Sequence, residues 1–151
     1  MKGGGQCLLS LCPYIYMDHS YSMRPLKKTY SFSEKKLASD GLNVLGMEIP
    51  QWVEFIADEE KLDMLTCARL AAFSEVCWLD AMQKNYKDFE FRLENLRGYF
   101  EKIGCKICPQ KIYRGKVKPP YVLTAASKWL FWTKNHDYEY DRLKELRDSE
   151  K

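Results

Sequence analysis

The sequence contains only two histidines among its 151 residues and no run of eighteen apolar residues. Without such a run, no helix can span a membrane. With so few histidines, histidine-based metal sites and catalytic triads have few candidates. The three glycines at positions 3–5 are not followed by the Lys-Ser/Thr pair of a phosphate-binding loop. These absences exclude a membrane protein and argue against a nucleotide-binding enzyme.

Acidic side chains are also absent from one long stretch. Residues 102–134 carry eight Lys or Arg and no Asp or Glu, whereas residues 48–101 carry twelve acidic and six basic side chains. The formal net charge of +3 is therefore a near-cancellation of an acidic and a basic segment. The charge of each segment, rather than the total, indicates what the protein binds.

The spacing of apolar residues predicts a mainly α fold. Three-and-four spacing predicts one long helix from Asp58 to about Asn85 and another from Tyr86 to Ile103, ended by Gly104. A short helix is expected over 51–56, another from about 122 to 134, and a last one from about Tyr140. We expect a compact bundle of about four to five helices, with irregular structure over 24–49 and a basic loop or small β element near 105–121.

The amino-terminal residues favour a leader rather than a signal peptide. The apolar run of 7–12 is short, is followed by Pro13 and lacks a small-x-small cleavage pattern. We therefore expect residues 1–22 to form a flexible leader and 23–151 a single helical domain. Without a signal, the six cysteines are expected to be reduced in a cytoplasmic protein.

The basic segment 102–134 predicts contact with nucleic acid or a nucleoprotein complex. Lysine and arginine neutralise phosphates, and the interleaved aromatic rings can stack on exposed bases. The alternative is that these cations face the acidic helices of the same chain. The candidate binding residues are Lys106, Lys111, Tyr113, Arg114, Lys116, Lys118 and Lys134.

A second hypothesis gives the acidic helices a role. They could mimic or capture a basic partner, so that the protein acts as an inhibitor or adaptor, as small proteins from mobile elements often do.

Cys105 and Cys108 provide half of a tetrahedral zinc site, but no second tight pair completes it. Two ordinary cysteines in a loop, with no cofactor, is the favoured interpretation.

A third hypothesis rests on a resemblance. The stretch 123–132, LTAASKWLFW, with Tyr140 and Asp141 after it, resembles part of the helix-hairpin-helix DNA glycosylases of the 8-oxoguanine type. The resemblance implies that Lys128 attacks the sugar carbon and that Asp141 assists, or that the protein is an inactive derivative. The glycine-rich hairpin of that family is missing. Taken together, the sequence favours a binding protein over an enzyme.

Overall fold

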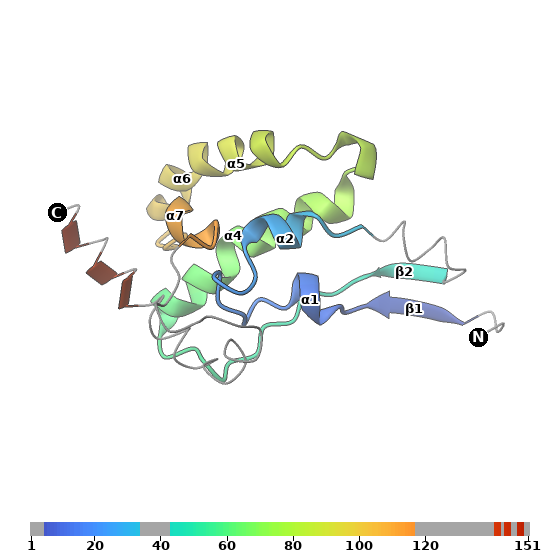
Figure 1. The fold of residues 1–151 in the computed structure, drawn as a ribbon, viewed down its shortest axis with the longest axis horizontal. Coiled ribbons are helices and arrows are strands. Elements are labelled where there is room, and N and C mark those ends of the chain that lie inside the picture. Colours follow the sequence, from blue (N-terminus) through green and yellow to red (C-terminus); the bar gives the residue numbers. More distant parts are fainter. Residues whose placement is uncertain (1–4, 34–42, 117–140, 143, 146–147, 150–151) are drawn as a thin grey trace.

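The computed structural model describes residues 5–33, 43–116, 141–142, 144–145 and 148–149. Two strands and a series of helices alternate along the first half of these residues, and helices alone follow (Figure 1). In chain order the elements are β1 (Gln6–Leu9), α1 (Cys12–Ile15), α2 (Leu26–Tyr30), β2 (Asn43–Met47), α4 (Glu59–Trp78), the 3-10 helix η1 (Ala81–Gln83), α5 (Tyr86–Asn95), α6 (Arg97–Lys102) and α7 (Gln110–Tyr113).

Helix α4 runs through the middle of the structure, between α5 and the two strands (Figure 1). Its start agrees with the prediction. The helix begins after Asp58 because the Asp58 side chain accepts a hydrogen bond from the Lys61 N–H and caps the first turn. It ends at Trp78, earlier than the predicted Asn85. The chain becomes extended at Leu79, and Asp80 then caps η1.

The two strands pair in parallel, with Gln6 opposite Asn43 and Leu9 opposite Met47. A parallel pair requires a crossover connection, and α1 and α2 lie within it. The register shifts between Cys7 and Leu8. Residues 24–49, predicted to be irregular or partly extended, therefore contain both a helix and a strand.

The structure differs from the predicted leader at the amino terminus. Residues 6–21 contribute β1 and α1, and the side chains of Leu9, Ile15 and Tyr21 are buried in the hydrophobic core. Burial of apolar surface fixes this segment against the body of the protein. It is part of the packed structure from Gln6 onwards.

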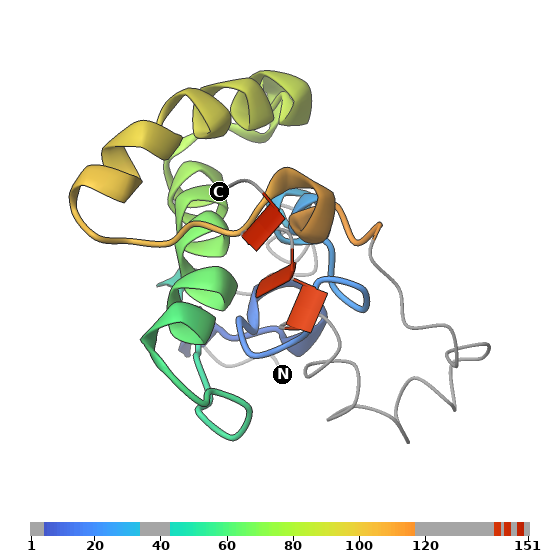
Figure 2. The same ribbon diagram turned by 90° about the vertical axis from the view of Figure 1, so that its left-hand side faces the viewer.

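The predicted 86–103 helix is divided into α5 and α6 at Leu96. Phe89 and Leu93 are buried as the stripe predicted, but Leu96 and Ile103 are exposed. Gly104, with a φ of 80°, follows the end of α6, so its predicted role as a stop is confirmed. Seen along the perpendicular view, α5 and α6 arch over one end of α4 (Figure 2).

The basic segment contains a helix where a loop or hairpin was expected, since α7 occupies Gln110–Tyr113. The predicted helix over 122–134 lies outside the described residues, so the helical class of the whole chain stays a prediction. No helix among the described residues is long and apolar enough to cross a membrane.

Candidate functional site

Two chain segments meet beyond the carboxyl ends of the parallel strands. Residues 16–19 follow β1 and α1, and residues 50–54 follow β2. The Glu48 N–H donates to the Leu9 oxygen at 3.0 Å, and the Met17 N–H donates to the Pro50 oxygen at 3.0 Å. These main-chain bonds bring the two segments side by side.

Aromatic rings from both segments lie together. The centroids of Tyr16 and Trp52 are 6.5 Å apart at an interplanar angle of 49°, and Tyr16 also stacks on His19 at 6.2 Å. The Trp52 side chain is 54% exposed. Tyr16 is half-buried, so the exposed Trp52 ring beside it offers a flat apolar surface to a ligand.

Two carboxylates accompany the rings. Asp18 is only 6% exposed, and within the described residues its Oδ1 has no hydrogen-bond partner. Burial raises the pKa of Asp18, and the negative charge of Glu54 raises it further against the opposing effects of a backbone hydrogen bond and Arg69. Glu54 itself is exposed. A buried acceptor without a partner is costly unless a ligand completes it.

Arg69 of α4 supports the first segment from beneath. It is fully buried, and its Nη1 donates to the Met17 oxygen at 2.6 Å while its Nη2 donates to the Arg24 oxygen at 3.0 Å. Its guanidinium also lies 3.8 Å from the centroid of the Tyr21 ring. Helix α4 therefore fixes the backbone next to Asp18.

His19 is held in the same region as a neutral imidazole. Burial, followed by the positive charges of Arg24 and Arg69, lowers the pKa of His19 to about 4. Its Nε2 lies 3.3 Å from the Cys12 Sγ. At neutral pH the site therefore gains no positive charge from this residue.

Helix α4 also positions the second segment. The Thr66 hydroxyl donates to Gln51 Oε1 at 3.3 Å, and Gln51 Nε2 donates to the Trp52 oxygen at 2.9 Å. The predicted short helix over 51–56 is wrong, because residues 51–53 are irregular and a turn follows at Glu54. This conformation leaves Trp52 exposed, whereas the helix would have buried it.

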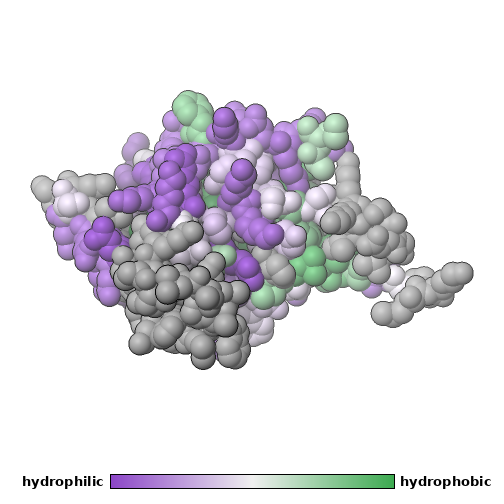
Figure 3. Space-filling view, viewed as in Figure 1, coloured by the Kyte–Doolittle hydropathy of each residue, from purple (hydrophilic) through white to green (hydrophobic). Residues whose placement is uncertain are grey.

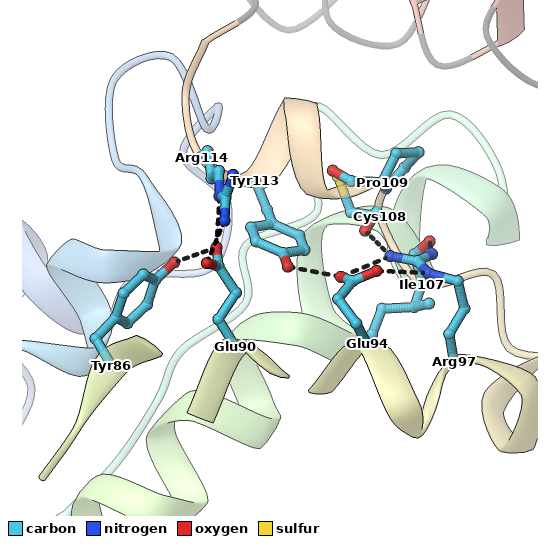
Figure 4. Close-up of polar contacts among 9 residues, drawn as sticks. All are labelled: Tyr86, Glu90, Glu94, Arg97, Ile107, Cys108, Pro109, Tyr113 and Arg114. Carbon is cyan, nitrogen blue, oxygen red and sulfur yellow. Dashed lines mark hydrogen bonds and ion pairs between the residues drawn. The ribbon is translucent and has the colours of Figure 1, made fainter. Parts of the chain in front are cut away.

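The residues predicted to bind nucleic acid are partly engaged inside the protein. Tyr113 is fully buried, and its hydroxyl donates to Glu94 Oε1 at 2.6 Å (Figure 4). The Arg114 guanidinium pairs with the Glu90 carboxylate of α5, with Nε and Oε1 2.7 Å apart (Figure 4). Arg97 of α6 donates hydrogen bonds to the Glu94 carboxylate of α5 and to the main-chain oxygen of Cys108.

The remaining basic candidates show two situations. The Lys106 N–H donates to Asp63 Oδ2 at 2.8 Å, and its Nζ lies 3.5 Å from Glu60 Oε2. Lys111 and Lys116 are exposed. In the view of Figure 3, the surface over α2 and α5 is mostly hydrophilic. Lys118 and Lys134 lie outside the described residues.

The other predicted sites are separated or not described. Cys105 forms a disulfide with Cys67 of α4, whereas Cys108 is buried and lies outside that bond. Lys128 lies outside the described residues, and Asp141 is exposed. Among the described residues, Cys105 is paired with Cys67 and not with Cys108, whereas the pairing of Lys128 with Asp141 stays a prediction.

Comparison with known proteins identifies the family. The model of the glycosyl hydrolase family 20 catalytic domain matches residues 4–81, which include both segments of the site and the whole of α4. The chain belongs to glycosyl hydrolase family 20. The matched region contains β1, β2, Arg69 and every aromatic and acidic residue of the site described above.

Individual relatives agree with this assignment. A β-hexosaminidase from Porphyromonas gingivalis is 32% identical over 74 residues, covering 47% of this chain and 10% of that protein. A β-N-acetylhexosaminidase from Cellulomonas fimi is 28% identical over 80 residues, covering 52% of this chain and 16% of that protein.

A solved structure shares the fold. An inactive mutant of the family 20 exo-β-N-acetylglucosaminidase from Vibrio harveyi matches with a TM-score of 0.60 and 19% identity, covering 68% of this chain and 18% of that one. The chain thus spans between about a tenth and a fifth of the length of each of these relatives.

These findings correct three hypotheses. The resemblance to DNA glycosylases is wrong, because the family match lies at 4–81 and not around Lys128 and Asp141. The nucleic-acid hypothesis is wrong, since the family acts on glycosides, and Lys106, Tyr113 and Arg114 contact acidic side chains of the same protein. The inhibitor or adaptor hypothesis fails for the same two reasons.

The residues of the site were missed for an identifiable reason. The charge pattern directed attention to 102–134, whereas Tyr16, Asp18, Trp52 and Glu54 lie in stretches of ordinary composition. One signal was present: Arg69 is the polar exception in an otherwise apolar helical stripe. A buried arginine requires acceptors, and following that requirement would have led to the segment around Met17.

Proposed function

We propose that this chain forms part of the substrate-binding wall of a β-N-acetylhexosaminidase. In this proposal Tyr16 and Trp52 contact a face of the amino sugar, and Asp18 and Glu54 accept hydrogen bonds from its hydroxyl groups. The observation that carries the proposal is that two segments covered by the family match bring Tyr16 next to Trp52 and place Asp18 within the electrostatic influence of Glu54.

The chemistry of a sugar ring matches this convergence. A pyranose has apolar C–H faces and a rim of hydroxyl groups, so its site needs flat apolar side chains together with a few fixed polar groups. Trp52 offers an exposed ring. Asp18 offers a buried carboxylate oxygen that has no partner within the described part of the chain. A sugar hydroxyl would satisfy that oxygen.

The position of the segments supports the same proposal. Ligands of sheets with helical crossovers bind beyond the carboxyl ends of parallel strands. Both segments follow the carboxyl ends of β1 and β2. The two sequence relatives are named as hexosaminidases, which suggests a β-linked N-acetylhexosamine as the substrate class.

Sugar binding by the chain itself tests the proposal. We would titrate the protein with N-acetylglucosamine and follow the indole N–H signals by NMR. The Trp52 signal should shift on saturation, and Trp52→Ala should weaken binding by roughly five- to thirtyfold, since loss of a stacked ring costs on the order of 1–2 kcal/mol.

Trp78 provides the matched control. It lies at the end of α4, is 87% exposed and is far along the chain from both segments. Trp78→Ala should leave the affinity for N-acetylglucosamine unchanged. Equal loss of binding in both variants, or sugar-dependent shifts confined to residues outside 16–19 and 50–54, would overturn the assignment of the site.

A further inference from the structure

A second cluster of reactive side chains lies on α4, outside the region proposed to bind sugar. Cys67 of α4 is joined by a disulfide to Cys105, which follows α6 and Gly104. Asp63 precedes Cys67 by four residues, so both side chains project from the same face of the helix. All three residues are half-buried.

The carboxylate is oriented toward the sulfur atoms. Asp63 Oδ1 lies 3.9 Å from the Cys67 Sγ, and Asp63 Oδ2 accepts a hydrogen bond from the Lys106 N–H at 2.8 Å. This second contact fixes the carboxylate and leaves Oδ1 directed at the cysteines. The orientation of the Asp63 carboxylate thus depends on the main chain of Lys106, the residue after Cys105. This contact links Asp63 of α4 to the segment that carries Cys105.

The spacing of these atoms fits a metal ion. One carboxylate oxygen and the two Sγ atoms all lie within 4.8 Å of one another. Zinc binds sulfur at about 2.3 Å and oxygen at about 2.0–2.2 Å, which places neighbouring ligands of a tetrahedral ion about 3.5 Å apart. Two thiolates and a carboxylate also form a donor set that suits zinc.

We propose that the reduced protein binds one zinc ion through Asp63, Cys67 and Cys105, with water as the fourth ligand. The disulfide and the zinc complex are then alternative states of one cluster that ties α4 to the segment after α6. This site does not depend on the proposed sugar-binding function.

The exchange between the two states balances with a dithiol as the reductant. A thiolate of the dithiol attacks one sulfur of the Cys67–Cys105 bond and forms a mixed disulfide. Its second thiol then displaces that sulfur, which leaves two protein thiols and an oxidised, cyclic dithiol. Zinc binding releases both thiol protons to solvent.

Neighbouring cysteines define the specificity of the cluster. Cys108 is fully buried, and its sulfur lies 3.7 Å from the Pro109 oxygen. Cys77 is exposed, ten residues after Cys67 on α4. Neither belongs to the group of ligand atoms among the described residues, so each can be changed without removing a proposed ligand.

Metal titration of the full chain tests the proposal. The protein is reduced with a dithiol, freed of reductant without oxygen, and titrated with Co²⁺, whose visible spectrum reports tetrahedral geometry and thiolate ligation. We expect one equivalent of Co²⁺ to bind and Zn²⁺ to displace it. The oxidised protein should bind no Co²⁺ in this manner.

Variants distinguish the proposed zinc ligands from the other cysteines of the chain. Asp63→Asn keeps an acceptor for the Lys106 N–H, so it should form the disulfide normally but lose at least tenfold in zinc affinity. Cys105→Ser should abolish the thiolate signal of this site, and Cys77→Ser should behave as the wild type. A reduced, folded protein without tetrahedral Co²⁺, or unchanged zinc affinity in Asp63→Asn or Cys105→Ser, would overturn the proposal.

Discussion

Arg69 Nη1 lies 2.6 Å from the Met17 main-chain oxygen, across 52 positions of sequence. The same guanidinium donates to the Arg24 oxygen and lies over the Tyr21 ring. Arg69→Met should therefore leave one buried and one partly buried carbonyl group without this donor and lower the free energy of unfolding by about 3 kcal/mol. Urea denaturation followed by circular dichroism measures this change.

Arg92 serves as the comparison for Arg69. Its half-exposed side chain pairs with Glu75 and Asp88 at 2.8 Å. Arg92→Met should cost no more than about 1 kcal/mol, since water and salt screen an exposed pair. If both variants lose the same stability, the buried guanidinium has no special role in fixing residues 16–19.

The lowered pKa of His19 predicts a pH-dependent stability. The unfolded chain takes up a proton near the ordinary pKa of 6.5, whereas the folded protein resists protonation until about pH 4. Stability from this residue is complete above pH 6.5 and declines as the pH falls toward 4, by up to about 3 kcal/mol. Urea unfolding across this range should show the decline.

His19→Asn removes the titrating group and should flatten this part of the stability profile. His136 is the other histidine of the sequence, and His136→Asn should retain the wild-type slope. An unchanged slope in His19→Asn would show that other groups dominate the pH dependence.

Asp18 predicts a pH dependence of sugar binding. Its pKa is raised above 3.8, chiefly by burial, so its carboxylate becomes protonated at a higher pH than an ordinary aspartate. The ionised form is the better acceptor for hydroxyl groups, and affinity for N-acetylglucosamine should therefore fall as the pH drops through this raised pKa.

Asp18→Asn should bind the sugar roughly fivefold more weakly at neutral pH, with affinity that no longer varies in this range. Asp88→Asn changes an exposed carboxylate on α5 that pairs with Arg92, and it should keep the wild-type pH dependence. The dissociation constants can be obtained from the NMR titration. A pH dependence that persists in Asp18→Asn would assign it to another residue.

Two glycines provide opposite tests of the backbone. Gly115 has a φ of 67°, and a Cβ there would lie 2.6 Å from the Tyr21 oxygen and 2.8 Å from Pro25 Cγ. Gly115→Ala should destabilise the protein by about 2 kcal/mol or more. Gly98 lies in α6, and a Cβ added there would meet no atom within 4 Å, so Gly98→Ala should stabilise by about 0.5–1 kcal/mol. Thermal unfolding distinguishes the two, and equal effects would contradict the strained contact at Gly115.

Local signals in the sequence predicted the elements that depend on neighbouring residues. Three-and-four spacing predicted the start of α4 at Asp58, and Gly104 predicted the end of α6. Where a long-range contact decides the conformation, these signals failed. A short helix was predicted over 51–56, but the Pro50 carbonyl just before it accepts from the Met17 N–H and residues 51–53 are irregular.

The site itself was not predictable from local patterns. Tyr16 and Trp52 come together only because β1 pairs in parallel with a strand 37 positions later. Nothing in the periodicity of either segment indicates that pairing. The basic segment 102–134 is evident in the sequence, but the sequence does not show what its cations face. In the structure Arg114 pairs with Glu90, and Lys106 pairs with Glu60.

The bond between Arg69 and Met17 also bears on how the protein folds. Helices such as α4 form from nearby residues, whereas contacts that close long loops lose more chain entropy and form more slowly. Because residues 16–19 are held by α4 and by Pro50, both distant in sequence, we expect them to acquire their native arrangement only after the helix has docked. The segments proposed to bind sugar are therefore expected to be among the last of these parts to order.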